Sequence, residues 1–325
     1  MPSHSTPLGA LPSRFRRQRV LIVGCGDVGL RVARLLPHTL KLMALTSSPS
    51  RLPELRAQRI TPLPGNLDDI GGLRRLAGLA TRVVHLAPPP NDKPNARDDP
   101  RTLRLLHALR ARGLPQSVVY GSTSGVYGDC RGEKVDETRP VSPHTPRAWR
   151  RVDAEGRLLQ FGRATGVHVH ILRIPGIYAP DREGGTPRGR LLRGTPVLDQ
   201  DDDVYTSHIH ADDLARACVA ALWRGKPQRV TNVCDNTELK MGDYFDLAAD
   251  IYQLPRPPRM ARKAAQGELP LLLLSFMSES RRLENARLKN ELKLVLRYPT
   301  VAQGLGCGSW RARNIDDLCR SEAGT

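Results

Sequence analysis

Three glycines at positions 24, 26 and 29 separate the apolar run Val20–Val23 from an amphipathic stretch. A turn of this kind between a strand and a helix binds anions, because the first N–H groups of the helix are free and its dipole is positive at that end. Gly24 would permit the tight turn, Gly26 would let the backbone approach a pyrophosphate, and Gly29 would let the helix pack close to the strand. The spacing therefore predicts dinucleotide binding, and the alternative is a turn without a ligand.

The end of the second apolar run, residues 41–46, indicates which dinucleotide binds. A preference for NAD would place a carboxylate there, to accept a hydrogen bond from the ribose 2′-hydroxyl. The chain instead has Thr46, Ser47 and Ser48, and Arg51 follows shortly after. Small hydroxyls and a guanidinium suit a 2′-phosphate, so we expect NADP(H), with NAD(H) as the alternative. An Arg51 that only solvates the start of a helix is the competing interpretation.

Further cofactor contacts are expected where the next two apolar runs end. Asn66 follows the third run, where its amide could hydrogen-bond an adenine ring or merely cap the next helix. Pro88 begins a stiff three-proline segment after the fourth run, which would fix the direction of that loop. The residues expected to contact the cofactor are Gly24, Gly26, Asp27, Val28, Gly29, Thr46, Ser47, Arg51, Asn66, Leu67, Leu86, Ala87, Pro88 and Pro175.

Apolar runs alternate with amphipathic stretches through much of the chain, a pattern typical of βαβ units and a parallel sheet. The sequence thus predicts an α/β protein with a doubly wound parallel sheet of the Rossmann type and a smaller C-terminal lobe. Strands are expected at residues 19–24, 41–46, 60–63, 82–87, 117–121, 168–172 and 229–233, and helices near residues 28–36, 70–79, 100–112, 147–165 and 211–224.

Changes in composition divide the chain into three regions. Residues 1–18 are rich in Ser, Pro and Arg, contain no acid, and are expected to form a disordered tail. We assign residues 19–174 together with 204–235 to the NAD(P)-binding domain. Residues 175–203 together with 236–325, which are richer in loops and short helical fragments, are assigned to a lobe that binds a substrate or a partner.

Charge and cysteine content narrow the functional classes. The 325-residue chain has a formal net charge of +17, and its arginines are dispersed, which is more typical of a solvated surface than of a nucleic-acid interface. Its six cysteines include no C-x-x-C pair, so reduced thiols in a cytoplasmic protein are expected. No apolar run is long enough to span a bilayer, and no membrane association is expected.

Eight segments together resemble the extended short-chain dehydrogenase/reductases, also described as NAD-dependent epimerase/dehydratases. They occur in the order of that family between about residues 19 and 305. The resemblance implies a doubly wound sheet that binds NAD(P) and a C-terminal lobe that closes over a substrate, often a nucleotide sugar. It also makes a homodimer or a monomer plausible. The matching segments are residues 24–29, 65–69, 85–90, 121–129, 136–143, 172–180, 208–217 and 232–238.

The resemblance implies a catalytic Ser or Thr followed by Tyr-x-x-x-Lys on one face of a helix. The hydroxyl residue is present as Thr123. Alignment on Glu155 places Arg147 at the Tyr position and Arg151 at the Lys position, and no Tyr occurs from residue 128 to 177. Arginine stays protonated and cannot act as a general acid or base near neutral pH. The two arginines would instead grip a phosphate, a carboxylate or the cofactor ribose.

Other residues could supply the missing proton: Tyr127, Tyr178, His144 and His208. A packing or solvent-facing role is the simpler interpretation of each. A metal site at His168 and His170 would need a third ligand at matched geometry, and none is expected. Asp212 and Asp213 follow His208 and His210. The resemblance explains that segment better as a strand-to-helix junction, in which Asp212 or Asp213 would cap the helix.

Three hypotheses follow. The first is an atypical NAD(P)-dependent oxidoreductase or epimerase that acts on a small molecule or a nucleotide sugar. The second is a catalytically silent NAD(P)-binding sensor or scaffold. The third is a basic nucleic-acid-associated protein that uses the fold only as a scaffold.

Overall fold

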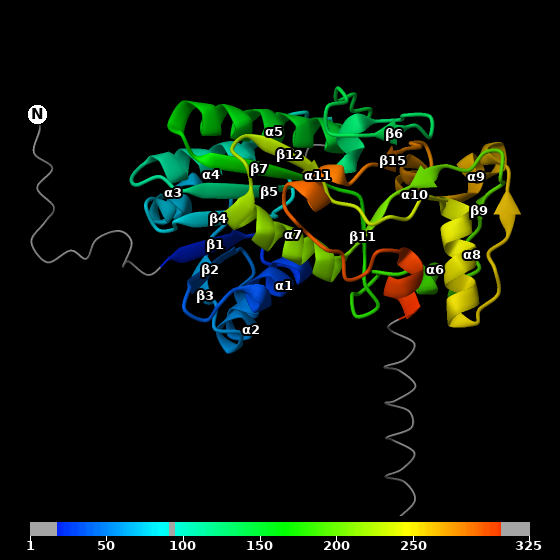
Figure 1. The fold of residues 1–325 in the computed structure, drawn as a ribbon, viewed down its shortest axis with the longest axis horizontal. Coiled ribbons are helices and arrows are strands. Elements are labelled where there is room, and N and C mark those ends of the chain that lie inside the picture. The colour runs from blue at the N-terminus through cyan, green and yellow to red at the C-terminus, as the bar shows by residue number, and fades with distance from the viewer. Residues whose placement is uncertain (1–17, 91–94, 307–325) are drawn as a thin grey trace, which may run out of the picture.

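The computed structural model describes residues 18–90 and 95–306, in which a central sheet carries helices on both faces and a smaller lobe lies at one end (Figure 1). The seven strands pair in the order β12-β7-β5-β4-β1-β2-β3, and every pair is parallel. This sheet confirms the predicted doubly wound architecture. The strands are β1 (Arg19–Val23), β2 (Lys41–Thr46), β3 (Thr61–Pro64), β4 (Arg82–His85), β5 (Ser117–Thr123), β7 (His168–Ile174) and β12 (Arg229–Asn232).

Helices cover both faces of the sheet, so the central strands are nearly continuous apolar runs rather than alternating ones. One core lies between the sheet and α1, α2 and α7, and the other lies between the sheet and α3, α4 and α5. Figure 1 shows α5 above the sheet and α1 below it. The helices are α1 (Asp27–Leu35), α2 (Leu52–Ala57), α3 (Ile70–Leu73), α4 (Pro100–Arg110), α5 (Pro146–Thr165) and α7 (Ala211–Arg224).

Local sequence signals fix the ends of α5, the longest of these helices. The Thr145 hydroxyl accepts a hydrogen bond from the Ala148 N–H at 3.2 Å, and Pro146 occupies the first helical position, where its missing N–H costs nothing. Gly166 ends the helix with a φ of +75°. The acidic N-cap expected for α7 at Asp212 or Asp213 is wrong, because the cap is His210, whose ring nitrogen Nδ1 accepts from the Asp212 N–H at 3.2 Å.

Most of the remaining elements form a lobe beside the carboxyl edge of the sheet (Figure 1), whereas Leu288 of the helix 286–290 packs into the core of the sheet domain. A separate core of Leu191, Val197, Phe245, Ala248 and Val301 holds the lobe together. Its strands pair in twos, β8 with β11, β9 with β14, β10 with β13 and β6 with β15. The elements are β6 (Lys134–Val135), β8 (Gly176–Tyr178), α6 (Arg188–Leu192), β9 (Val197–Leu198), β10 (Tyr205–Thr206), β11 (His208–His210), β13 (Leu239–Lys240), α8 (Met241–Tyr252), β14 (Arg259–Met260), α9 (Arg262–Glu268), α10 (Leu271–Phe276), β15 (Arg282–Leu283) and α11 (Ala286–Asn290).

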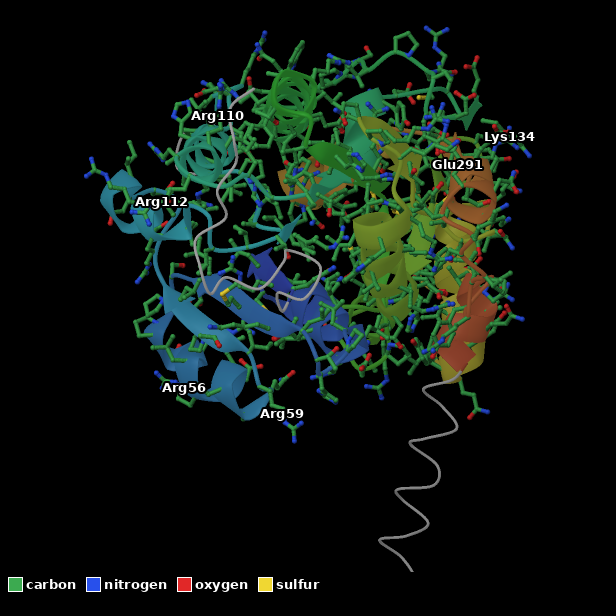
Figure 2. All side chains as sticks on the ribbon, turned by 60° about the vertical axis from the view of Figure 1, so that its left-hand side comes forward. Arg56, Arg59, Arg110, Arg112, Lys134 and Glu291 are labelled. Atoms are coloured by element: carbon green, nitrogen blue, oxygen red, sulfur yellow. The ribbon has the colours of Figure 1, made fainter. Side chains whose placement is uncertain are left out.

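Basic side chains project from the surface of the sheet domain, among them Arg56, Arg59, Arg110 and Arg112 (Figure 2). In the described part of the chain, no helix has both the length and the apolar composition of a membrane span. Within the same residues, no three His, Cys, Asp or Glu side chains gather in a way that could hold a metal ion. The expected tail lies almost wholly outside the described residues, and the proposed domain boundaries stay a prediction.

Candidate active site

The three glycines of the turn after β1 differ in their surroundings. Gly24 has a φ of +86°, and a Cβ there would lie 2.3 Å from the backbone nitrogen of Ala87. A Cβ on Gly29 would lie 3.1 Å from the Gly24 carbonyl oxygen and 3.3 Å from the Ile22 side chain. A Cβ on Gly26 would meet no atom within 4 Å. Gly24 is therefore required by the fold and Gly29 is tightly packed, whereas Gly26 borders open space at the start of α1.

This open space belongs to a cleft of about 320 Å³ at the carboxyl ends of the central strands. Asp27, Val28 and Gly29 form the first turn of α1 beside it, whereas Pro175 lies at a second cavity. The cleft brings together most of the residues expected to contact a cofactor, namely Gly24, Gly26, Thr46, Ser47, Arg51, Asn66, Leu67, Leu86, Ala87 and Pro88.

Two arginines flank this cleft. The Arg51 guanidinium donates to the Cys25 carbonyl oxygen at 2.5 Å and pairs with Glu54 at 3.2 Å, so it packs against the glycine turn. Arg101 also lines the cleft, where Asp68 holds its guanidinium at 2.6 Å and keeps the pKa of that carboxyl below its usual value. Nothing in the sequence indicated that Arg101 lies at this cleft, because only the fold brings α4 to the loop after β3.

Asn66 remains available as a cofactor contact. Its side-chain oxygen accepts from the Asp68 N–H at 3.0 Å, and Asp69, not Asn66, caps the next helix. Cys25 lies within the glycine turn but is buried, which raises the pKa of its thiol to about 11 and leaves it unreactive.

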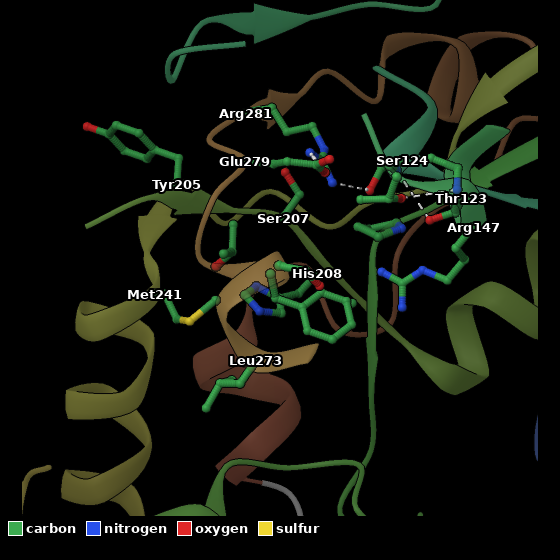
Figure 3. Close-up of a pocket in the computed structure, with 18 of the residues that line it drawn as sticks. Thr123, Ser124, Arg147, Tyr205, Ser207, His208, Met241, Leu273, Glu279 and Arg281 are labelled. Atoms are coloured by element: carbon green, nitrogen blue, oxygen red, sulfur yellow. Dashed lines mark hydrogen bonds and ion pairs between the residues drawn. The ribbon is translucent and has the colours of Figure 1, made fainter. Parts of the chain in front are cut away.

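A second cavity of about 430 Å³ opens between the sheet and the lobe (Figure 3). Thr123, Arg147, Arg151, Pro175 and Gly176 line it from the sheet side. Strands β5 and β7 pair in register from Ser117/His168 to Thr123/Ile174, so both strands end at this edge. The lobe closes the other side with Arg190, Tyr205, Ser207, His208, Met241 and Phe276. The sequence did not predict these lobe contributions, apart from His208.

Thr123 stands at the junction of β5 and a short 3₁₀ turn, Ser124–Tyr127. Its hydroxyl oxygen accepts from the Gly125 N–H at 3.2 Å, which orients the side chain at the cavity. The neighbouring Ser124 hydroxyl lies 3.5 Å from Arg281 Nη2. The Thr123 hydroxyl is thus held at the carboxyl edge of the sheet, and its catalytic role stays a prediction.

Arg147 and Arg151 lie one helical turn apart on α5 and both line the cavity, but their surroundings differ. Arg151 Nη1 donates to the Tyr120 hydroxyl at 2.9 Å and to the Gly121 carbonyl at 2.8 Å. Arg147 stacks over the Phe276 ring at 4.8 Å and is otherwise exposed at the mouth of the cavity. Partial desolvation lowers the pKa of Arg147, an effect that nearby Glu279 opposes.

A buried ion pair fixes the helix that carries these arginines. Glu155 accepts from Arg173 Nη2 at 2.8 Å and from the Ser122 hydroxyl at 2.6 Å, and both charged side chains are buried. The pair ties α5 to the two strands that end at the cavity. The carboxylate raises the pKa of Arg173 despite the opposing effect of burial.

The alternative proton donors are mostly engaged elsewhere. The Tyr127 hydroxyl donates to Asn232 at 2.8 Å, and the Tyr178 hydroxyl donates to the Thr300 carbonyl at 3.3 Å. His144 is exposed on the loop before α5. Only His208 lines the cavity, where it stacks against Tyr244 and where burial lowers its pKa to about 4.

A family model and a curated relative each match most of the chain. A family model described as the NAD dependent epimerase/dehydratase family matches residues 20–234. The GDP-6-deoxy-D-mannose reductase of Pseudomonas aeruginosa is 27% identical over 274 residues, which cover 77% of this chain and 86% of that protein.

Solved structures share the fold. A conserved protein of unknown function from Silicibacter pomeroyi has a TM-score of 0.76 and 29% identity, over 91% of this chain and 99% of that one. The UDP-glucose 4-epimerase of Thermotoga maritima has a TM-score of 0.74 over 92% and 99% of the two chains. At 19% identity, the latter similarity bears on the fold alone.

Proposed function

Because the chain belongs to the NAD dependent epimerase/dehydratase family, we propose that it is an NAD(P)-dependent oxidoreductase or epimerase with an atypical active site. Its substrate is a small anionic molecule of the nucleotide-sugar class, as the name of the Pseudomonas aeruginosa reductase suggests. The observation that carries the proposal is the open space at Gly26, where a Cβ would meet no protein atom. The packing of the fold does not require glycine at this position. A glycine at the start of a helix instead allows a pyrophosphate to approach the backbone closely, because no side chain is in the way.

The residues around this space fit a pyridine dinucleotide. Gly24, Gly26 and the first turn of α1 would hold the pyrophosphate, Asn66 and Leu67 would border the adenine, and Leu86 to Pro88 would border the nicotinamide-side ribose. The bound nicotinamide would supply or accept a hydride. We infer a preference for NADP(H), because Thr46, Ser47 and Arg51 line the same cleft without an acid at the end of β2.

The chain's own residues at the second cavity would bind and orient the substrate. Thr123 would hydrogen-bond a substrate oxygen, and Arg147 would neutralise an anionic group or a developing negative charge. Arg151 donates to Tyr120 and Gly121, so it would hold the end of β5 in place and contribute positive charge to the cavity without binding the substrate directly. The family's Tyr and Lys are replaced, which makes the acid–base step atypical.

Two measurements test the proposal. Calorimetric titration with NADPH and with NADH should show binding, tighter for NADPH. Turnover should then be followed through the nicotinamide absorbance, with keto-sugar nucleotides as substrates, and through product analysis for epimerisation. Absence of binding to both dinucleotides would reject the proposal. Binding without turnover on any substrate, in the wild type and in the R147Y/R151K variant, would favour the catalytically silent sensor.

A further inference from the structure

The second cavity is strongly cationic. Its charged lining consists of four arginines, at positions 147, 151, 190 and 281, and one acid, Glu279. His208 adds no charge at neutral pH, because burial lowers its pKa to about 4. A cavity with this excess of positive charge favours anionic ligands.

Two of the four guanidinium groups are already engaged by the protein. Arg281 Nη1 lies 2.7 Å from Glu279 and donates to the Gly128 carbonyl at 2.9 Å. Arg151 donates to Tyr120 and Gly121. Arg147 and Arg190 are therefore the arginines left to meet a ligand.

Arg190 has unused hydrogen-bond donors. Its Nε and Nη2 atoms are buried and have no partner among the described residues, and its guanidinium packs over the Phe245 ring at 4.3 Å. Burial lowers its pKa to about 10, and Arg193 adds to this effect. Buried donors without acceptors are unfavourable, so this side chain is suited to a charged acceptor supplied from outside.

Neighbouring polar atoms in the same cavity are also unsatisfied. Thr206 Oγ1 and His208 Nδ1 are buried without a partner in the described part of the chain. Unpaired buried polar groups are few in native proteins, and their concentration here indicates a site that a polar ligand completes.

Arg147 and Arg190 reach the cavity from different sides, Arg147 from α5 of the sheet domain and Arg190 from α6 of the lobe. Figure 3 shows Arg147 beside Thr123, across the cavity from Met241. Arg190 packs on Phe245, which lies one helical turn beyond Met241 on α8. Among the described residues Arg147 makes no hydrogen bond; its guanidinium packs on the face of Phe276, and Glu279 lies near it. The two available cations thus come from different parts of the molecule, one from the lobe and one from the helix beside Thr123.

We infer that the substrate carries two separate anionic groups. A phosphate or diphosphate binds Arg190 in the lobe, and a carboxylate on the reacting sugar binds Arg147 next to Thr123. The substrate class is thereby a nucleoside diphosphate sugar acid rather than a neutral nucleotide sugar. This inference rests on the proposed function, and it assigns to the family's Tyr position a specificity role through a bidentate guanidinium–carboxylate contact.

The test compares ligands that differ only in the carboxylate, on the full chain saturated with NADPH. The probes are UDP-glucuronate against UDP-glucose, and glucuronic acid 1-phosphate against glucose 1-phosphate, with affinities measured by calorimetry. The acid should bind roughly tenfold or more tightly than its neutral partner in at least one pair, the size of a charge-assisted hydrogen bond. R147Q should abolish this ratio, because the acid loses far more affinity than its neutral partner while NADPH binding is retained, and R147K should restore part of the ratio.

Arg190 provides the second arm. R190Q should weaken both members of a pair equally, because it removes the phosphate contact. R163Q on α5 and R188Q on α6 are matched controls, since both side chains are exposed and neither lines the cavity. Equal binding of acid and neutral ligands in both pairs, or a ratio that survives R147Q, would overturn the inference. Loss of NADPH binding by the wild type would contradict the proposed function instead.

Discussion

Arg151 links α5 to β5 by donating to the Tyr120 hydroxyl at 2.9 Å and to the Gly121 carbonyl at 2.8 Å. Tyr120 is completely buried, which raises the pKa of its phenol to about 12. The Arg151 guanidinium is therefore part of the structure of the sheet edge. Arg147, one turn earlier, has no such hydrogen bonds and faces the cavity.

This difference predicts that substitutions at the two positions have unequal effects on stability. R151A should lower the free energy of unfolding by about 1–3 kcal/mol, because it leaves a buried hydroxyl and a carbonyl without a partner. R151K should recover only part of the loss, since an ammonium lacks the fork of donors. R147A is the matched control and should change stability by less than about 0.5 kcal/mol. Urea denaturation measures all three, and equal losses for R151A and R147A would contradict the structural role.

The glycine turn gives a second prediction, about binding without a change in fold. G26A should leave the free energy of unfolding within about 0.5 kcal/mol of the wild type, because the new Cβ meets no atom within 4 Å. It should weaken NADPH binding by about 1.5 kcal/mol or more, because the methyl group occupies the approach of the pyrophosphate. Calorimetry and urea denaturation separate the two effects.

G24A is the counterpart of that variant. Its Cβ would lie 2.3 Å from the Ala87 nitrogen at a φ of +86°, so it should destabilise the fold by more than about 1 kcal/mol. A G26A protein that binds NADPH as the wild type does would place the pyrophosphate elsewhere.

Arg51 leads to a prediction about cofactor choice. R51A should weaken NADPH binding by about 1.5–3 kcal/mol, because a guanidinium–phosphate contact is charge-assisted. NADH binding should change much less, because NADH has no 2′-phosphate. R56A is a suitable control, since Arg56 lies on α2 next to Arg51 but is exposed away from the cleft (Figure 2). If R51A weakens the binding of NADPH and NADH equally, Arg51 does not distinguish the two dinucleotides.

The sheet and the residues along its cleft could be predicted from the sequence, because they depend on local patterns. Each predicted strand of the sheet is present within a few residues, since continuous apolar runs such as Val20–Val23 can be buried only between two helical layers. Helix α2 was missed, because Leu52–Ala57 is short and buries only Leu55.

The lobe side of the active site could not be predicted in this way. Strands β9 and β14 have two residues each and join segments about sixty positions apart, so neither shows a period. Arg190, Glu279 and Arg281 line the same cavity only because distant parts of the chain fold together in the lobe. The sequence could therefore place Thr123, Arg147 and Arg151 at one edge of the sheet, but not the charges that face them.

The lowered pKa values of the buried histidines lead to a prediction about how the free energy of unfolding depends on pH. Burial lowers the pKa of His208 to about 4, from an ordinary value of 6.5, because the charged ring would lose its hydration. A depressed histidine pKa gives stability that is present above pH 6.5 and is lost as the pH falls toward 4. His170 and His85 are shifted in the same direction, to about 4 and about 3. Asp235 acts oppositely: burial raises its pKa to about 7, so its contribution is lost as the pH rises from about 4 to 7.

The H208F variant isolates one of these contributions. Phe retains the ring that stacks on Tyr244 at 4.1 Å and removes the buried, unpartnered Nδ1 atom. The variant should be at least as stable as the wild type above pH 7. Its stability relative to the wild type should increase as the pH falls from 6.5 and reach about 3 kcal/mol near pH 4. The pKa difference between the unfolded and folded states sets this value, reduced slightly because His208 is half protonated in the folded protein at pH 4. The other titrating groups are common to both proteins and cancel in the difference. Urea denaturation at several pH values measures this difference, and a constant value from pH 7 to 4 would show that His208 is solvated in the folded protein.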